Sequence, residues 1–139
     1  MIISNPKVLV GADSGSWGEE VAAWYARKRL KFKILGQNVR VGRRDEIDLI
    51  CRDRKILVFL EVKTRKSEAF GAPIDAVDAS KRAHLSRAAA RYISQLKDPR
   101  ILVRFDVIEV VGEPSRERIE VRYLPDVFQI EGGYEFPGV

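Results

Sequence analysis

The strongest pattern in the chain is a pair of apolar runs near its middle, with charged residues inserted at regular places. The runs cover residues 44–50 and 58–65, and the polar stretch 52–55 lies between them. Two β-rich runs around a short polar turn are typical of an antiparallel hairpin. The sequence therefore predicts two paired strands at the centre of the fold.

Side chains alternate between the two faces of a strand, so Glu61 and Lys63 share one face with Phe59. A turn of even length, such as Asp53-Arg54 alone, places Asp48 opposite Phe59, on that same face and diagonal to Glu61. An odd turn sends Asp48 to the other face unless a bulge corrects it. The even turn brings two carboxylates and one ammonium together on an apolar sheet.

Such a convergence of charge has a chemical interpretation. Ionised groups among apolar residues are costly unless they pair or hold a metal. Asp48 and Glu61 side by side repel each other, and a hard divalent cation such as Mg²⁺ relieves this through oxygen ligands. Lys63 can neutralise one carboxylate, orient a water or stabilise charge developing on a phosphate. The alternative is a structural Glu61–Lys63 ion pair on a solvent-facing strand, with Asp48 simply solvated.

The segment before the hairpin predicts a helix that ends at about Leu30, because Val21 and Tyr25 fall on one helical face. Ser16 as N-cap and Glu19 three residues later fit a capping box. Glu19 therefore either caps this helix or belongs to the metal site, and both roles stay open. A strand is expected to follow over residues 32–41.

A second helix is expected over about residues 79–97. Its apolar positions recur at helical spacing on one face: Leu85, Ala89, Tyr92, Ile93 and Leu96. The opposite face is basic, and no acidic residue interrupts it between Lys81 and Lys97. This one-sign bias favours contact with phosphate groups.

Two more strands are expected, over residues 101–111 and 118–123. Asp106 lies among apolar residues of the first, where it either supports the metal site from behind or pairs with Arg104. We divide the chain into a loose leader or edge segment (1–14), one α/β domain (15–125) and an apolar tail (126–139). The tail is expected to cover the domain or a partner subunit.

Composition narrows the class of protein. The 139 residues suit one globular domain, being 45% hydrophobic and 32% charged. The net charge of +5 favours a polyanionic partner. A lone cysteine, Cys51, excludes an intramolecular disulfide and a cysteine-based zinc site. With neither a long apolar stretch nor a signal-like start, we expect no membrane association and a cytoplasmic protein.

The central residues also carry a resemblance. Glu-Ile-Asp-Leu-Ile at 46–50 and Phe-Leu-Glu-Val-Lys-Thr-Arg at 59–65 resemble the YraN-like family of bacteria. That family is placed in the PD-(D/E)XK superfamily, alongside archaeal Holliday-junction resolvases. The similarity covers roughly residues 15 to 125. It implies a restriction-endonuclease-like α/β fold, a three-layer sandwich with a mixed central sheet flanked by helices in the order α-β-β-β-α-β-β.

By the superfamily pattern, Asp48 and Glu61 would bind a Mg²⁺ or Mn²⁺ ion and Lys63 would assist the attacking water. Glu19, on the first helix, would be the additional catalytic and metal-binding acid. One departure is visible, since Asp45 stands where family members usually carry Gly. This change is expected either to alter the local turn or to add another acid near the site.

The expected function is a metal-dependent nuclease that hydrolyses phosphodiester bonds, of DNA rather than RNA. A set of basic residues would grip the nucleic-acid backbone without reading its sequence: Arg44, Arg65, Lys66, Lys81, Arg87 and Arg91. The alternative is a non-catalytic nucleic-acid-binding module or a DNA-processing adaptor on the same scaffold. A homodimer would suit an enzyme that acts on two strands.

Overall fold

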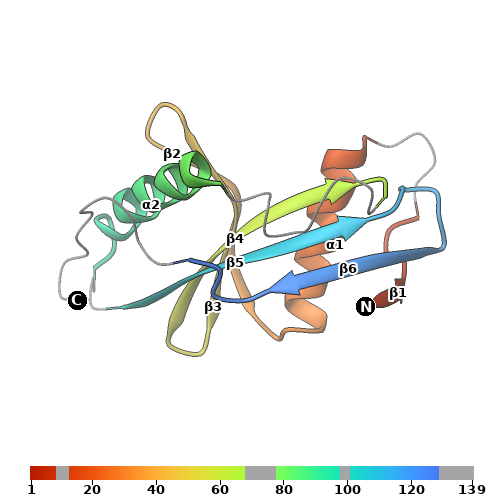
Figure 1. Ribbon diagram of the computed structural model, residues 1–139. Helices are drawn as coiled ribbons and strands as arrows, with labels where there is room; N and C mark the ends of the chain where they lie inside the picture. Colours follow the sequence, from red (N-terminus) through yellow and green to blue (C-terminus); the bar gives the residue numbers. More distant parts are fainter. Residues whose placement is uncertain (9–12, 68–77, 98–100, 129–139) are drawn as a thin grey trace.

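The computed structural model describes residues 1–8, 13–67, 78–97 and 101–128. They form a six-stranded mixed sheet in the order β1-β6-β5-β4-β3-β2, with two helices (Figure 1). Only β4 and β5 run parallel among these paired strands. The elements are β1 (Ile2–Ser4), α1 (Ser14–Lys28), β2 (Lys33–Val41), β3 (Asp45–Asp53), β4 (Ile56–Arg65), α2 (Ala79–Ile93), β5 (Leu102–Val111) and β6 (Arg118–Leu124).

The predicted central hairpin is confirmed, with its turn one residue later than expected and its register therefore shifted by two residues. Asp53 pairs with Ile56, so the turn is Arg54-Lys55, still of even length. Arg54 has a φ of 57°, the positive value that a two-residue hairpin turn requires. This register sets Asp48 directly across from Glu61 instead of diagonal to it.

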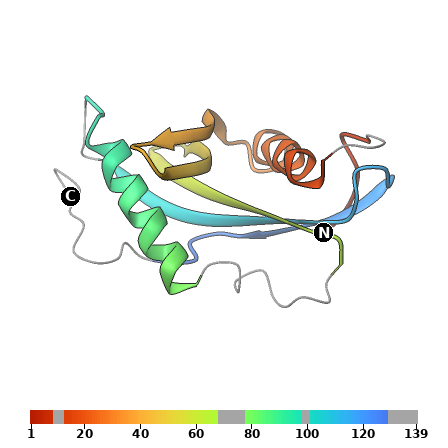
Figure 2. The ribbon, with the colours of Figure 1, turned by 90° about the horizontal axis from the view of Figure 1, so that it is seen from above.

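The two helices cover opposite faces of the sheet, so the molecule has three layers (Figures 1 and 2). Strand β4 shows the division, because Val58 and Leu60 pack in the α1 cluster while Leu57 and Phe59 pack in the α2 cluster. All four are at most 2% exposed. The expected α/β class with a mixed sheet between helices is confirmed.

Helix α1 begins earlier than the capping-box pattern predicted. Its N-cap is Asp13, whose side chain accepts a hydrogen bond of 3.0 Å from the Ser16 amide. Asp is a strong N-cap, and its negative charge suits the helix dipole, so Ser16 falls inside the helix. The prediction that Ser16 and Glu19 form a capping box is therefore wrong, which frees the Glu19 carboxylate.

Helix α2 is capped by Asp78, which accepts a 2.9 Å hydrogen bond from the Lys81 amide. The predicted apolar face is confirmed, since Leu85, Ala89 and Ile93 are at most 3% exposed against β2 and β3. The helix ends at Ile93, with Ser94 as C-cap, four residues before the expected end. Among the described elements, no helix is long and apolar enough to cross a membrane.

Both ends of the chain add to the sheet region. The N-terminal segment supplies the edge strand β1, which pairs with β6, so the edge-segment interpretation is correct. The start of the tail packs on the domain, because Phe128 stacks on Phe105 with ring centroids 4.4 Å apart. The rest of the predicted tail, from residue 129 onward, lies outside the described residues.

Asp106 is a structural acid. It is 1% exposed and binds Arg104 through two 2.9 Å hydrogen bonds. It also accepts hydrogen bonds from the Tyr123 hydroxyl at 2.6 Å and from the Asp126 amide at 2.8 Å. These contacts tie β5, β6 and the tail together, so pairing with Arg104 is the observed alternative.

Candidate active site

The candidate site lies where two central strands separate. Strands β3 and β4 are paired up to Leu49 and Leu60 and then diverge, β3 remaining beside β2 and β4 beside β5 (Figure 1). Beyond this point the Val62 amide donates a 2.8 Å hydrogen bond to Oδ2 of Asp48, a side-chain acceptor. The carboxylate of Asp48 therefore occupies the gap that strand separation opens.

A kink in the neighbouring strand accompanies the gap. Asn38 stands between Gln37 and Val39, which pair with Leu49 and Ile47, so it lies across from Asp48. Its φ of 49° is left-handed, a conformation that Asn tolerates better than most residues. The β2–β3 hairpin bends away from β4 in this region.

Asp48 and Glu61 form a hydrogen-bonded carboxyl pair in the gap. Burial raises the pKa of Glu61 to about 7, with the Asp48 charge as the second cause. Burial is also the main cause that raises the pKa of Asp48, against the stabilising hydrogen bond from Val62. Near neutral pH the pair therefore holds a proton readily, and it attracts cations once that proton is lost.

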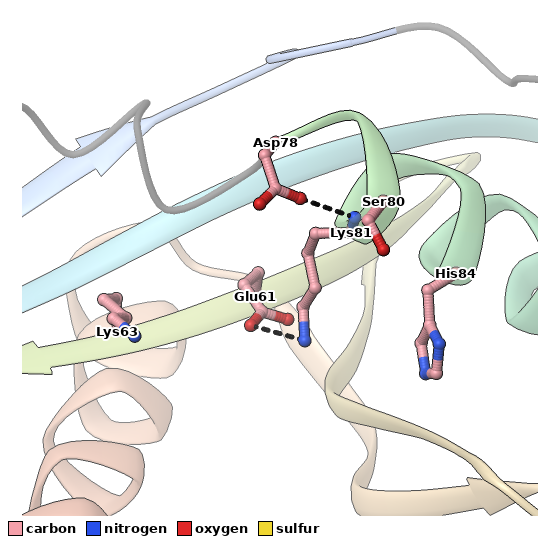
Figure 3. A pocket seen from close by; sticks show the side chains of 6 residues that line it. All are labelled: Glu61, Lys63, Asp78, Ser80, Lys81 and His84. Atoms are coloured by element: carbon pink, nitrogen blue, oxygen red, sulfur yellow. Dashed lines mark hydrogen bonds and ion pairs between the residues drawn. The ribbon is translucent and has the colours of Figure 1, made fainter.

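One cation already contacts the pair. The Nζ atom of Lys81 lies 3.1 Å from Oε1 of Glu61, and it reaches down from the first turn of α2 (Figure 3). Since Asp78 caps this turn through the Lys81 amide, the backbone that carries Lys81 is fixed. Beside the ion pair lies a pocket of about 320 Å³, lined by Glu61, Lys63, Asp78, Ser80, Lys81 and His84.

Lys63 is placed as the alternation predicts, on the same strand as Glu61 and lining the same pocket (Figure 3). It is exposed, whereas Glu61 is 8% exposed. In the structure the ammonium that contacts Glu61 is that of Lys81 rather than Lys63. The proposed Glu61–Lys63 structural pair is therefore not the arrangement found, and the Lys63 ammonium stays at the pocket.

Glu19 approaches the gap from the α1 side. Gly18 makes this approach close, because a Cβ at that position would lie 1.9 Å from Oγ1 of Thr64 on β4. Burial raises the pKa of Glu19, a hydrogen bond from Asn38 opposes the rise, and repulsion from Asp48 adds to it. The carboxylate is thus directed toward the site and not toward the helix backbone.

The three predicted metal ligands do not form one compact set. Across residues 1–8, 13–67, 78–97 and 101–128, no three His, Cys, Asp or Glu side chains are grouped closely enough to hold an ion together. Asp48 and Glu61 are a pair, with Glu19 close enough to repel Asp48. The protein ligands that the site offers a cation are therefore the carboxyl oxygens of Asp48 and Glu61.

Asp45, the departure from the family pattern, has a structural role. It is 3% exposed and accepts hydrogen bonds of 2.9 and 2.7 Å from Nε and Nη2 of Arg87. Nε2 of His84 lies 3.1 Å from the same carboxylate. The hydrogen bond from Arg87 is the main cause that lowers the pKa of Asp45. The residue joins β3 to α2 and does not enter the Asp48–Glu61 pair.

The basic residues predicted to grip nucleic acid divide into two groups. Arg65 is mostly buried, with Nε 2.9 Å from Oε2 of the fully buried Glu109, and Lys81 and Arg87 bind acids of β4 and β3. The other three are exposed: Arg44, Lys66 and Arg91. Contact with phosphate stays a prediction for all six, but the second group offers the more accessible cations.

The sequence did not predict Asn38 and His84 as residues of the site. It predicted Lys81 as a contact for nucleic acid but not as a partner of Glu61. The spacing of Lys81, His84 and Arg87 at i, i+3 and i+6 was a usable signal, because it places them along one side of a helix. Asn38 had a weaker signal, standing in a Gly-Gln-Asn stretch that interrupts an otherwise β-rich run.

The fold and this site define an α/β protein whose mixed sheet opens, between two helices, around a pair of carboxyl groups, one buried (Glu61) and one half-buried (Asp48). The chain belongs to the uncharacterised protein family UPF0102, the YraN-like family, whose family model matches residues 18–110. A UPF0102 protein of Syntrophotalea carbinolica is 39% identical over 120 residues, which cover 85% of this chain and 93% of the relative. One from Geotalea daltonii is 40% identical over 116 residues, covering 84% and 89%. One from Clostridium beijerinckii is 33% identical over 123 residues, covering 87% and 97%.

Proposed function

We propose that this chain is a metal-dependent nuclease of the PD-(D/E)XK superfamily, with a restriction-endonuclease-like arrangement of its sheet and helices. The observation that carries the proposal is the Asp48–Glu61 pair in the gap between β3 and β4. The pair interrupts the ladder between two central strands, and burial there raises the pKa of both groups. Folding alone gives no reason for such an arrangement, whereas cation binding does.

The donor set fits Mg²⁺ or Mn²⁺. Both groups offer oxygen ligands, which hard divalent cations prefer, and an adjacent pocket of about 320 Å³ leaves room for water and a phosphate. The Val62 amide fixes the orientation of Asp48, so one ligand is preorganised. When bound, the ion would supply Lewis acidity toward a phosphoryl oxygen and lower the pKa of an attacking water.

The chain's own residues supply the remaining requirements. The Lys63 ammonium lies at the pocket, where it offsets negative charge that develops on the phosphate in the transition state. Glu19, held by Asn38 and close to Asp48, adds an acceptor that orients water from the α1 side. The accessible cations Arg44, Lys66 and Arg91 suit a polyanionic backbone, as does the net charge of +5. DNA is the proposed substrate.

A second candidate is a non-catalytic nucleic-acid-binding module on the same scaffold. The Lys81–Glu61 ion pair favours it, because an internal ammonium neutralises part of the carboxyl charge without any metal. In that case Asp48, Glu61 and Lys81 would form a structural network, and divalent cations would have no effect on the protein.

The two candidates are separated by a cleavage assay on branched, nicked, duplex and single-stranded DNA, with matching RNAs, in millimolar Mn²⁺ or in EDTA. A nuclease cuts at least one substrate in Mn²⁺ only. Lys63→Ala should then reduce turnover by about 100-fold or more with nearly unchanged substrate affinity. Lys55→Ala, which removes an exposed lysine of the β3–β4 turn, is the matched control. Binding without cleavage, and no thermal stabilisation by Mn²⁺, would favour the module.

A further inference from the structure

The contact between Lys81 and Glu61 joins the site to a helix that the strand motif does not include. Lys81 lies on α2, and its Nζ is 3.1 Å from the carboxylate oxygen of Glu61. Asp48 hydrogen-bonds to the same Glu61. One ammonium thus sits where the charge of two carboxyl groups is concentrated, which is also the position a divalent cation would need.

We propose that Lys81 is an exchangeable counter-ion: it neutralises Glu61 in the metal-free protein, leaves when a divalent cation binds, and then contacts a phosphate of the substrate. The inference rests on the proposed function for its cation site. It adds a specific order of events, in which cation binding turns a residue engaged within the protein into one that binds nucleic acid.

Displacement follows from charge. An ammonium and a divalent ion bound to one carboxylate would lie within about 5 Å of each other, where repulsion between charges of +1 and +2 is strong even in a high dielectric. Lys81 can yield, because its side chain is 35% exposed and its four-carbon stem is flexible. Glu61 cannot, because its side chain is only 11% exposed on a central strand.

The pocket offers the displaced ammonium a destination. Lys81 lines it together with Lys63, and the two project from α2 and β4 respectively (Figure 3). With Glu61 taken by the cation, two ammonium groups would face the same space. That combination suits a phosphodiester, because each ammonium can donate a charge-assisted hydrogen bond to one of its two non-bridging oxygens.

The first arm of the test measures cation affinity without any substrate. Mn²⁺ is titrated into wild type, Lys81→Met, Lys81→Arg and Lys97→Met by calorimetry at pH 8.5, where protonation of the carboxyl pair interferes least. We expect Lys81→Met to bind Mn²⁺ about threefold to tenfold more tightly than wild type, because the competing charge is gone. Lys81→Arg and Lys97→Met, an exposed lysine beyond the end of α2, should stay near wild type.

The second arm measures binding of a phosphorothioate oligonucleotide in Ca²⁺ and in EDTA. In Ca²⁺, Lys81→Met should bind about threefold to tenfold more weakly and lose about one unit of salt-dependence slope. In EDTA the loss should be smaller than twofold, because Glu61 then holds Lys81. Lys97→Met should show the same small change in both conditions.

Each outcome has a distinct meaning. If wild type binds Mn²⁺ but Lys81→Met binds it equally or more weakly, Lys81 is a fixed structural partner and the inference fails while the nuclease proposal stands. An equal loss of oligonucleotide affinity in Ca²⁺ and EDTA also overturns it. If wild type binds no divalent cation, the nuclease proposal fails and the inference fails with it. Thermal melts of every variant verify that the comparison is made on folded protein.

Discussion

Asp45 and Arg87 are joined by two hydrogen bonds, of 2.9 and 2.7 Å, between the first residue of β3 and the middle of α2. Together with Lys81–Glu61 and His84–Asp45, this pair attaches one side of α2 to acids of two strands. The basic side of the helix is therefore partly used to dock it. Its positive charge does not by itself mark a nucleic-acid surface.

Arg87→Ala and Arg91→Ala should have opposite signatures. Arg87→Ala leaves the buried Asp45 with His84 alone and should lower the free energy of unfolding by about 2 kcal/mol. Its effect on the salt dependence of DNA binding should be small. Arg91 is exposed and lies beside Gly42. Replacing it should change stability little but lower the slope of DNA affinity against salt concentration by about one unit. Urea denaturation and binding at several salt concentrations measure both, and equal loss of slope in the two variants would contradict this division.

Glu61→Gln should change how stability depends on pH. The pKa of Glu61 is about 7 in the folded chain against an ordinary 4.5, so between these values the folded state holds more protons than the unfolded state. Wild-type stability should therefore fall as pH rises from 5 to 7, by up to about 3 kcal/mol from this group. Urea denaturation at half-unit intervals of pH should give a flatter profile for Glu61→Gln. Glu20→Gln, on the exposed side of α1, should keep the wild-type slope; an identical slope in Glu61→Gln would refute the assignment.

Asp13→Ala and Glu19→Gln test which acid caps α1. Asp13 accepts the Ser16 amide, so its replacement should cost about 1 kcal/mol of stability. Glu19→Gln should change stability by less than about 0.5 kcal/mol, because Glu19 does not cap the helix and Gln keeps the size of this half-buried side chain and an oxygen that can accept from Asn38. It should instead weaken Mn²⁺ binding, by less than Glu61→Gln does. A capping box would give the reverse order in thermal melts.

Gly18→Ala should destabilise the packing of α1 against β4. The added Cβ would lie 1.9 Å from Oγ1 and 3.0 Å from Cβ of Thr64, so either the helix or Thr64 must move. We expect a loss of about 2 kcal/mol in urea denaturation, typical of overpacking. Gly15→Ala, whose Cβ would meet only the Asp13 side chain at 3.3 Å, is the matched control and should be neutral or slightly stabilising. Adding Thr64→Ala should recover part of the loss, and no recovery would place the strain elsewhere.

The sequence predicted those features that depend on neighbouring residues. The hairpin, the shared face of Asp48, Glu61 and Lys63, and the apolar side of α2 all follow from periodicity, which operates over a few residues. The exact register did not follow, because Asp53-Arg54 and Arg54-Lys55 are both plausible two-residue turns. Only the choice of the second sets Asp48 directly across from Glu61.

Charge partners were harder to predict because they are distant in the sequence. Asp45 and Arg87 are separated by 42 positions, and no local pattern relates them. The second helix does carry basic residues without acidic ones between Lys81 and Lys97. The acids that pair with these basic residues, Asp45 and Glu61, lie on strands β3 and β4. The capping box failed for a different reason: Ser16 with Glu19 and Asp13 with Ser16 are rival local solutions, and the sequence pattern does not rank them.

The gap between β3 and β4 interrupts the regular pairing of the sheet, and the same gap makes room for Asp48 beside Glu61. If the ladder continued past Leu49 and Leu60, the Val62 amide would bond to a backbone carbonyl and Asp48 would lose its place. Selection for thermal stability alone would therefore favour Val or Thr at positions 48 and 61, which suit continuous pairing. A lineage that keeps both acids is maintaining an opening that folding by itself would close.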